Sequence, residues 1–303
     1  MNLAIVIPYY KIDYFAETLE SLAQQTDQRF QVYIGDDASP YSPEELLKNY
    51  EGKFNFTYKR FDDNLGSISL TKQWERCIAM MKDEEWFMIL GDDDLLTENV
   101  VQDFHKNLEE FAQISSVVRF SSQGFIQETG RQGEVFHHPK LENALDYLLR
   151  KLKGETRGSL SEYVFRKSSF QKYRFKDYFY GWTADDRAVL DFSEGKPIFS
   201  INTLVKVRNS EQSITGSKKN IDRLIESRKK SMKDLLLDYG NQLDDNQKKF
   251  IFTIFEAQFF KSQSVSLNDV FFLVKNTFEY FTLRYSILQL KSIFYKIILN
   301  KKD

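Results

Sequence analysis

The chain has 303 residues, of which 42% are hydrophobic, and this length is enough to bury a large core in one or two domains. Its 42 basic and 44 acidic residues leave a formal net charge of −2, so overall charge does not favour nucleic-acid binding. The single cysteine, Cys77, excludes an intrachain disulfide framework and favours a reducing compartment. The N-terminus lacks a signal-peptide pattern, and no apolar run approaches the roughly 20 residues that span a bilayer. We therefore expect a cytoplasmic protein.

The first hundred residues alternate between short apolar runs and amphipathic segments. Phe15, Leu19 and Leu22 recur at helical spacing, and Ser42-Pro43 followed by two glutamates is typical of a helix start. We expect strands at 3–7, 30–35, 54–59 and 86–90, with helices at 14–26, from 42 onwards, and at 68–81. This alternation predicts an α/β sandwich with a mainly parallel sheet, whose ligands lie at the carboxyl ends of the strands.

Acidic residues follow two of these strands directly. Asp36 and Asp37 end the second strand, and Asp92 to Asp94 follow the fourth, so both groups are expected at one edge of the sheet. Adjacent carboxylates repel, and a hard divalent cation such as Mg²⁺ or Mn²⁺ would offset their charge. The structural alternative is an ordinary polar loop in which Asp94 or Thr97 caps a helix beginning near Glu98.

Five short motifs in the first 110 residues resemble the family 2 glycosyltransferases of the GT-A fold. They are "IVIPYYK", "SLAQQT", "IGDDAS", "NLG" at 64–66 and "GDDD", the last resembling the family's D-x-D metal motif. Three positions depart from the family pattern, namely Lys11, Ala38 and Gly91. The resemblance implies a three-layer, Rossmann-like nucleotide-diphospho-sugar transferase sandwich that uses Mn²⁺ or Mg²⁺.

The resemblance also implies roles for individual residues. Tyr10 would stack on a nucleobase and Asp37 would accept a hydrogen bond from it, while Asp36 either lies alongside or is only a turn residue. Asp93 is favoured as the metal ligand, with Asp92 either sharing that role or lying nearer the sugar or ribose. The full set expected to bind the donor nucleotide is Pro8, Tyr10, Asp36, Asp37, Asn64, Gly66, Lys72 and Asp92.

An inverting transfer also needs a base that removes the proton of the acceptor hydroxyl. Asp185 and Asp186, in "YFYGWTADDRAVLDF", are similar to the family's E-D motif, and the order of the pair favours Asp186 over Asp185. The structural alternative is that Thr183 caps a helix whose dipole the two aspartates complement.

The remaining sequence completes the predicted domains. Strands are expected at 115–120, 161–165 and 197–201, with a short helix at 167–173. The resulting catalytic domain, 1–205, would comprise a nucleotide-sugar-binding half (1–110) and an acceptor half (111–205). A polar linker at 206–220 and a helical appendage would form the region 206–303.

The sequence therefore predicts an inverting hexosyltransferase (EC 2.4) that moves a sugar, favoured to come from a UDP-sugar, to a saccharide or lipid-linked saccharide during surface polysaccharide synthesis. Two alternatives are a non-catalytic nucleotide or carbohydrate-binding module and a sugar nucleotidyltransferase, although "PYYKID" differs from the glycine-rich loop that the latter needs. Lysines interleaved with Ile and Phe after residue 283 predict either core packing or peripheral contact with an anionic membrane on its inner face.

Overall fold

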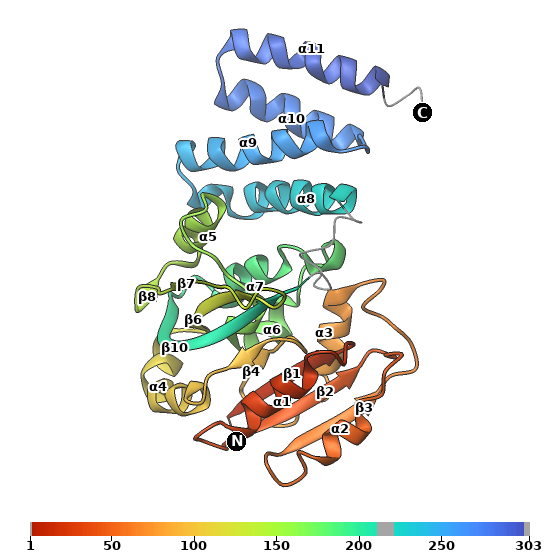
Figure 1. Cartoon of the computed structure of the whole chain (residues 1–303). Coiled ribbons are helices and arrows are strands. Elements are labelled where there is room, and N and C mark those ends of the chain that lie inside the picture. The colour runs from red at the N-terminus through yellow and green to blue at the C-terminus, as the bar shows by residue number, and fades with distance from the viewer. Residues whose placement is uncertain (1, 211–220, 300–303) are drawn as a thin grey trace. The chain divides into compact units, whose positions relative to one another are not determined.

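The computed structural model describes residues 2–210 and 221–299, and the chain divides into two compact units, Met1–Ser217 and Lys218–Asp303. The first unit is built around one ten-stranded mixed sheet with helices packed on it (Figure 1). The α/β sandwich predicted from the sequence is confirmed.

The elements of the first unit match most of the predicted ones, with their ends shifted by a few residues. Helix α2 begins at Glu44 rather than at Pro43, which lies at its N-cap. In chain order, with 3₁₀ helices written η, the elements are β1 (Leu3–Tyr9), α1 (Phe15–Ala23), β2 (Phe30–Asp36), α2 (Glu44–Lys48), β3 (Phe56–Arg60), α3 (Leu70–Ile78), β4 (Trp86–Ile89), β5 (Leu95–Leu96), α4 (Val100–Ile114), β6 (Val117–Ile126), β7 (Gln132–Phe136), β8 (Leu141–Glu142), α5 (Ala144–Leu152), η1 (Leu160–Glu162), β9 (Tyr163–Arg166), α6 (Lys167–Tyr173), η2 (Phe179–Gly181), α7 (Ala184–Ser193) and β10 (Ile198–Asn209).

The sheet has the strand order β3-β2-β1-β4-β9-β6-β10-β5, with β7 paired to β6 and β8 to β10. Strands β3, β2, β1 and β4 are parallel, β9 is antiparallel to both of its neighbours, and β6 and β10 are again parallel to each other. The carboxyl ends of β1, β2, β4, β6 and β10 therefore lie along the same edge of the sheet.

Helices cover both faces of the sheet because its central strands are apolar on both sides. On one face, Leu3, Ile5 and Ile7 of β1 belong to a core that includes α1 and α4 side chains. On the other face α3 packs so closely that a methyl group at Gly35 of β2 would lie 2.3 Å from the Cys77 sulfur. This close approach explains why glycine precedes the two aspartates of "IGDDAS".

Strand β10 extends into the segment that the sequence predicted to be a polar linker. Residues 206–209 pair in parallel with β6, from Lys206 opposite Gln123 to Asn209 opposite Ile126. Arg208 is only 3% exposed although its polarity suggested a solvated loop. Residues 211–220 of the predicted linker lie outside the described residues.

The second unit contains the helical appendage that the sequence predicted. Its helices are α8 (Ile221–Tyr239), α9 (Asp245–Lys261), α10 (Leu267–Tyr280) and α11 (Leu283–Leu299), with a 3₁₀ turn, η4, at Gly240–Gln242. Asp244 and Gln247 form a capping box at the start of α9. Phe252, Phe255 and Phe272 pack together between α9 and α10. Within the described residues, no helix is both long and apolar enough to cross a membrane.

Candidate active site

The two acidic motifs lie where β1, β2 and β4 end. The last residue of β1, Tyr9, is in register with Asp36 at the end of β2, and the Asp37 N–H donates to the Tyr9 carbonyl at 3.0 Å. Strand β4 lies on the other side of β1 and runs directly into Gly91 and the three aspartates. The parallel register of three strands thus brings together segments that are about 30 to 80 residues apart in the sequence.

Asp36 is a fully buried carboxylate whose two oxygens are already bonded within the protein. Its Oδ1 accepts from the Ser39 N–H at 2.8 Å, and its Oδ2 accepts from the Tyr58 hydroxyl at 2.7 Å and from Arg60 at 2.8 Å. Ala38, which directly precedes Ser39 in this turn, has a φ of +51°, a left-handed conformation that glycine adopts at lower cost. These contacts match the turn role that the sequence left open for Asp36.

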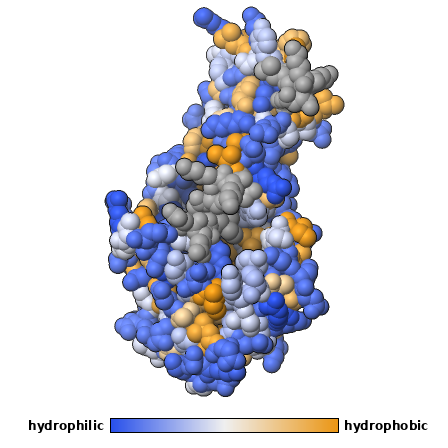
Figure 2. All heavy atoms as spheres, turned by 45° about the vertical axis from the view of Figure 1, so that its right-hand side comes forward, coloured by the Kyte–Doolittle hydropathy of each residue, from blue (hydrophilic) through white to orange (hydrophobic). Residues whose placement is uncertain are grey.

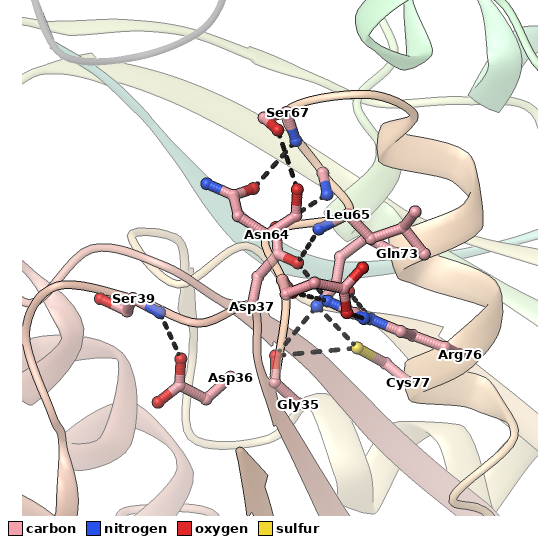
Figure 3. A network of polar contacts seen from close by, with 12 residues as sticks. Gly35, Asp36, Asp37, Ser39, Asn64, Leu65, Ser67, Gln73, Arg76 and Cys77 are labelled. Atoms are coloured by element: carbon pink, nitrogen blue, oxygen red, sulfur yellow. Dashed lines mark hydrogen bonds and ion pairs between the residues drawn. The ribbon is translucent and has the colours of Figure 1, made fainter. Parts of the chain in front are cut away.

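Asp37 fixes the Asn64-Leu65-Gly66 loop through the loop's backbone (Figure 3). Its Oδ1 accepts from the Leu65 N–H at 2.8 Å and its Oδ2 from the Gly66 N–H at 2.9 Å. A methyl group at Gly66 would lie 2.5 Å from Oδ2, so this close approach requires glycine. The loop ends in a turn in which the Asn64 side chain accepts from the Ser67 N–H at 2.9 Å.

Arg76 of α3 is the main cationic partner of Asp37, and the sequence analysis did not identify it. Its guanidinium contacts the Asp37 carboxylate, pairs with Asp63 at 2.7 Å and lies 4.0 Å from the centre of the Phe61 ring. Burial raises the pKa of Asp37, whereas the Gly66 and Leu65 N–H groups and Arg76 oppose that shift. Asp37 is thus a buried carboxylate that is hydrogen-bonded on both oxygens.

Asp92 joins the acidic loop to the end of β1. One carboxylate oxygen, Oδ2, accepts from the backbone N–H groups of both Tyr10 and Lys11, each at 2.7 Å. The Tyr10 carbonyl in turn accepts from the Ser39 hydroxyl at 2.6 Å, which anchors the same residue to the Asp36 turn. The Tyr10 ring is 38% exposed. An exposed aromatic ring is therefore held at a fixed backbone position between the two acidic motifs.

The other two aspartates differ in their surroundings. Asp94 is 5% exposed, and its carboxylate accepts from the Ser161 hydroxyl and from the Arg208 N–H at 2.9 Å. It is an internal anchor rather than a helix cap, because α4 begins only at Val100 and its N-cap, Asn99, makes no side-chain cap bond. Asp93 is half-buried. A Cβ at Gly91 would lie 3.1 Å from Asp93 Oδ1 and 3.0 Å from Asp94 Oδ2, so a methyl group there would press on both carboxylates.

Arg208 of β10 holds the backbone of the acidic loop. Its Nε donates to the Asp93 carbonyl at 2.8 Å, its guanidinium pairs with Glu17 at 2.6 Å, and it stacks between the Tyr14 and Phe125 rings. The sequence analysis missed this residue because it lay in the predicted linker. No local pattern could have revealed a contact between positions 115 residues apart.

The acidic loop has the electrostatics that favour a bound cation. Burial raises the pKa of Asp92 to about 6 and that of Asp94 to about 7, and the charge of Asp93 adds to both shifts. Burial also raises the pKa of Asp93, although Lys11 and Arg208 lower it. Ionising neighbouring buried carboxylates is unfavourable unless positive charge is nearby. Within the described residues, no group of three or more His, Cys, Asp or Glu side chains is arranged to hold a metal ion.

Asp185 and Asp186 lie in the first turn of α7. Thr183 precedes this helix at its N-cap but makes no side-chain cap bond there. Both carboxylates face Lys151 of α5, whose Nζ lies 2.5 Å from Asp186 Oδ1 and 3.8 Å from Asp185 Oδ2. The sequence analysis did not identify Lys151.

The remaining predicted donor residues are Pro8 and Lys72. Pro8 is half-buried in β1 opposite Gly35, and Lys72 is exposed in the first turn of α3. A cavity of about 310 Å³ lies among α4, β10 and the segment before β8, and it is lined by Asp103, Asn107, His138, Lys140 and residues 199–203. None of the predicted site residues lines this cavity.

The chain was compared with protein families and with known proteins. The model of "Glycosyl transferase family 2" matches residues 4–174, more than half of the chain. The chain therefore belongs to glycosyl transferase family 2 and is a glycosyltransferase. A search of curated proteins gave no match.

Several solved structures share the fold. S. aureus TarS 1-349 in complex with UDP-GlcNAc has a TM-score of 0.63 and 16% identity, over 92% of this chain and 80% of that one. The same TarS segment in complex with UDP has a TM-score of 0.59 and 16% identity, over 90% and 78%. A structure of S. aureus TarS that is not restricted to the 1-349 segment has a TM-score of 0.63 and 17% identity, over 99% of this chain and 54% of that one. At these identities the likeness establishes the GT-A fold of this chain.

Proposed function

We propose that this glycosyltransferase transfers a sugar, with inversion, from a UDP-sugar to a saccharide or glycoconjugate acceptor. The observation that carries this proposal is the hydrogen bond that the Tyr10 backbone N–H donates to the Asp92 carboxylate. This bond holds the exposed Tyr10 side chain beside the acidic loop. The UDP and UDP-GlcNAc complexes of TarS, which has the same fold, support a uridine nucleotide.

The nucleotide would lie across the ends of β1 and β2. The Tyr10 ring would stack on the base, as exposed aromatic side chains commonly do with nucleobases. Asp37 would accept from the base N–H through Oδ2, whose second lone pair lies beside the Gly66 N–H, because Oδ1 already accepts from the Leu65 N–H and from Arg76. Pro8, Asp36 and Asn64 would shape this subsite through the backbone, whereas Lys72 would reach the diphosphate from α3.

A divalent cation suits the residues of the acidic loop. Among the described residues, Asp92 Oδ1 has no hydrogen bond, and the Asp93 carboxylate has only one from its own backbone N–H. Both side chains are half-buried, and burial raises the pKa of each. Asp93, with Asp92 beside it, would hold Mn²⁺ or Mg²⁺, and donor phosphate oxygens would complete the ligand set. Such an ion stabilises negative charge on a departing diphosphate. Asp94 would serve only as the buried anchor of the loop.

The acceptor side would be formed by the residues before and within α7. An acidic pair, Asp185 and Asp186, lies in the first turn of that helix, and a carboxylate there would remove the proton of the acceptor hydroxyl. We propose that the acceptor belongs to a surface polysaccharide or a lipid-linked precursor, following the prediction from the sequence.

A titration of nucleotides tests the donor site. UDP, GDP, CMP and dTDP would be titrated by calorimetry with and without Mn²⁺, against the wild type and Asp93→Ala. We expect metal-dependent binding of UDP that Asp93→Ala removes, with Glu134→Ala, an exposed carboxylate on β7 outside the site, as the control. Nucleotide binding without any transfer or hydrolysis would instead favour a binding module. If no nucleotide binds in the presence of Mn²⁺, the proposed donor site is wrong.

We also propose that α11 contacts an anionic membrane surface. Leu283, Ile287, Leu290, Phe294 and Ile298 recur every three or four residues and are all exposed, so they form one apolar stripe. Arg284 and Lys291 flank this stripe, and α11 contains no acidic residue. Figure 2 shows hydrophobic (orange) and hydrophilic (blue) side chains side by side in the upper part of the picture, where Figure 1 shows α9 to α11. An apolar stripe bordered by cations is typical of helices that lie in a membrane interface.

A further inference from the structure

A polar cavity lies beside the first half of β10, and none of the described residues of the proposed donor and acceptor sites lines it. Its walls come from α4, from the segment before β8 and from β10, which Figure 1 shows close together. Most of the lining side chains are polar, and the volume of about 310 Å³ is at the small end of the range found for ligand pockets. The cavity therefore suits a small polar group.

An irregularity in β10 shapes this cavity. The parallel pairing of β10 with β6 passes over Asn202 and Thr203, so β10 has two extra residues at this point. On the opposite edge of β10, pairing with β8 ends at Phe199 and pairing with β5 begins at Val205. The bulge therefore lies in the gap between two short edge strands. Bulges redirect side chains and are frequent beside functional sites.

Asp103 and Asn107 of α4 lie on one face of the helix because they are four residues apart. The Thr203 hydroxyl donates to Asp103 Oδ2, which places this face against the bulge. The Asn107 amide donates to the Asp103 carbonyl at 2.8 Å. Within the described part of the chain, Asp103 Oδ1, Asn107 Oδ1 and the Asn202 amide make no hydrogen bond to another residue. The cavity thus offers unused acceptors and donors from both walls.

Among the described lining residues, no cation is free to bind an anion. Lys140 Nζ pairs with Glu110 at 2.6 Å and lies 5.4 Å from the centre of the Phe199 ring. The His138 side chain is 0% exposed, so this residue lines the cavity through its backbone. Asp103 adds a negative charge that would repel a phosphate group. A ligand at this place should therefore be neutral and rich in hydroxyl groups, unlike a nucleotide.

We propose that this cavity binds one sugar unit of a saccharide. Each sugar hydroxyl both donates and accepts, so neighbouring hydroxyls match a carboxylate oxygen that lies beside amide groups. Thr203 precedes Arg208, which holds the acidic loop, by five residues, or roughly 17 Å along an extended strand. A saccharide of several units that is bound in the cavity would therefore reach toward the transfer site.

The saccharide is the acceptor, and this part of the inference rests on the proposed function. Holding a distant unit of the acceptor raises the effective concentration of its reacting end at the acidic pair of α7. Longer acceptors should therefore bind more tightly than single sugars, with no new contact at the donor site. Binding of a saccharide in the cavity needs neither transfer nor metal, so it is tested by itself.

Binding is measured with the full chain in the absence of metal and nucleotide. The probes are maltose, cellobiose, lactose and N,N′-diacetylchitobiose, neutral disaccharides that differ in linkage and substituents. Saturation-transfer NMR detects binding, and calorimetry gives the Kd. We expect at least one disaccharide to bind the wild type and none to bind Asn202→Trp, because the indole ring would fill the cavity from an exposed position.

The double variant Asn107→Ala/Asn202→Ala removes two hydrogen-bonding side chains and should raise the Kd about 10-fold or more. Asn55→Ala, a change at an exposed asparagine before β3, is the matched control and should leave the Kd unchanged. Thermal unfolding checks that each variant is folded. If the double variant does not fold, Asn202→Trp still decides the question, because the exposed Asn202 side chain makes no hydrogen bond to a described residue.

If no disaccharide binds the wild type, or if binding persists unchanged in both cavity variants, the inference is wrong. UDP release from UDP-glucose and UDP-GlcNAc tests the proposed function separately. A chain that binds a saccharide in the cavity but releases no UDP would keep this site and contradict the UDP-sugar donor. Release of UDP without saccharide binding would contradict the cavity site alone.

Discussion

The backbone N–H of Gly66 donates to Asp37 Oδ2 at 2.9 Å, and a methyl group at Gly66 would lie only 2.5 Å from the same oxygen. The contact explains why an acidic residue after β2 and a glycine 29 positions later form one structural unit.

Gly66→Ala should displace Asp37 or the loop at 64–66. We expect a loss of about 1–3 kcal/mol in unfolding free energy, because the added methyl overpacks a carboxylate that Leu65 and Arg76 hold in place. UDP affinity should fall at the same time. Chemical denaturation and calorimetry measure the two effects. Gly240→Ala is the control, since a Cβ there meets no atom within 4 Å; equal behaviour of the two variants would contradict this account.

Asp94→Ala should lower the stability of the fold, whereas Asp93→Ala should remove the response to metal. Asp94→Ala leaves the buried Ser161 hydroxyl and the Arg208 N–H without their acceptor, so we expect a loss of about 2–3 kcal/mol. Asp93→Ala should change stability little but remove the rise in Tm that Mn²⁺ with UDP produces in the wild type. Differential scanning fluorimetry with and without Mn²⁺ and UDP measures both. If Asp94→Ala were as stable as the wild type, its anchoring role would be wrong.

Glu162 should make the folded state less stable as pH rises. This side chain is fully buried, and burial raises its pKa from 4.5 to about 7. Below pH 4.5 it is protonated in both states; above that, the unfolded chain loses the proton first, so stability falls until the folded carboxyl ionises near pH 7. A shift of this size corresponds to about 3 kcal/mol.

His138 acts in the opposite sense. Its Nε2 lies 4.0 Å from Glu162, too far for a hydrogen bond, and burial together with Arg119 lowers the pKa of His138 from 6.5 to about 3. The unfolded chain therefore binds a proton on this imidazole between about pH 3 and pH 6.5 that the folded chain does not, so His138 makes stability rise with pH in that range. Glu162→Gln should remove the falling contribution alone, so the variant should gain unfolding free energy relative to the wild type as pH rises from 5 to 8. The exposed Glu134→Gln serves as the control. A wild-type pH slope that Glu162→Gln leaves unaltered would mean that Glu162 is not the group responsible.

The α11 stripe should bind vesicles that carry phosphatidylglycerol but not vesicles of phosphatidylcholine alone. Leu290→Gln/Phe294→Gln should lower the bound fraction at least 10-fold, because each side chain contributes about 1.5–3 kcal/mol when fully buried. Flotation of the full chain measures this, with Phe271→Gln, a change at an exposed aromatic residue of α10, as the control. If the stripe instead pairs two copies of the chain, sedimentation velocity will detect a dimer that the double variant abolishes, and vesicle binding will be absent.

The sequence by itself was sufficient for the fold class and for locating both acidic motifs at one sheet edge. Alternation of apolar runs and amphipathic segments is a local property, and residues that end parallel strands must meet at one edge of the sheet. The same reasoning placed Asp36, Asp37 and Asp92 to Asp94 correctly. The prediction of a polar linker was wrong at 206–209, which belong to β10. The buried Arg208 makes this part of the strand look like a solvated linker in the sequence.

Only the tertiary structure decided which partner each charged side chain has. The Asp36 carboxylate accepts hydrogen bonds from Tyr58 and Arg60. The Asp93 backbone carbonyl accepts from Arg208, and the Asp186 carboxylate forms an ion pair with Lys151. In each case the partners are far apart in the sequence. Sequence patterns record periodicity along one element, whereas the charge balance of a buried carboxylate depends on side chains that separate elements bring within about 3 Å. The sequence therefore determined where the acidic groups lie, and the packing of α3, α5 and β10 determined which of them are structural anchors.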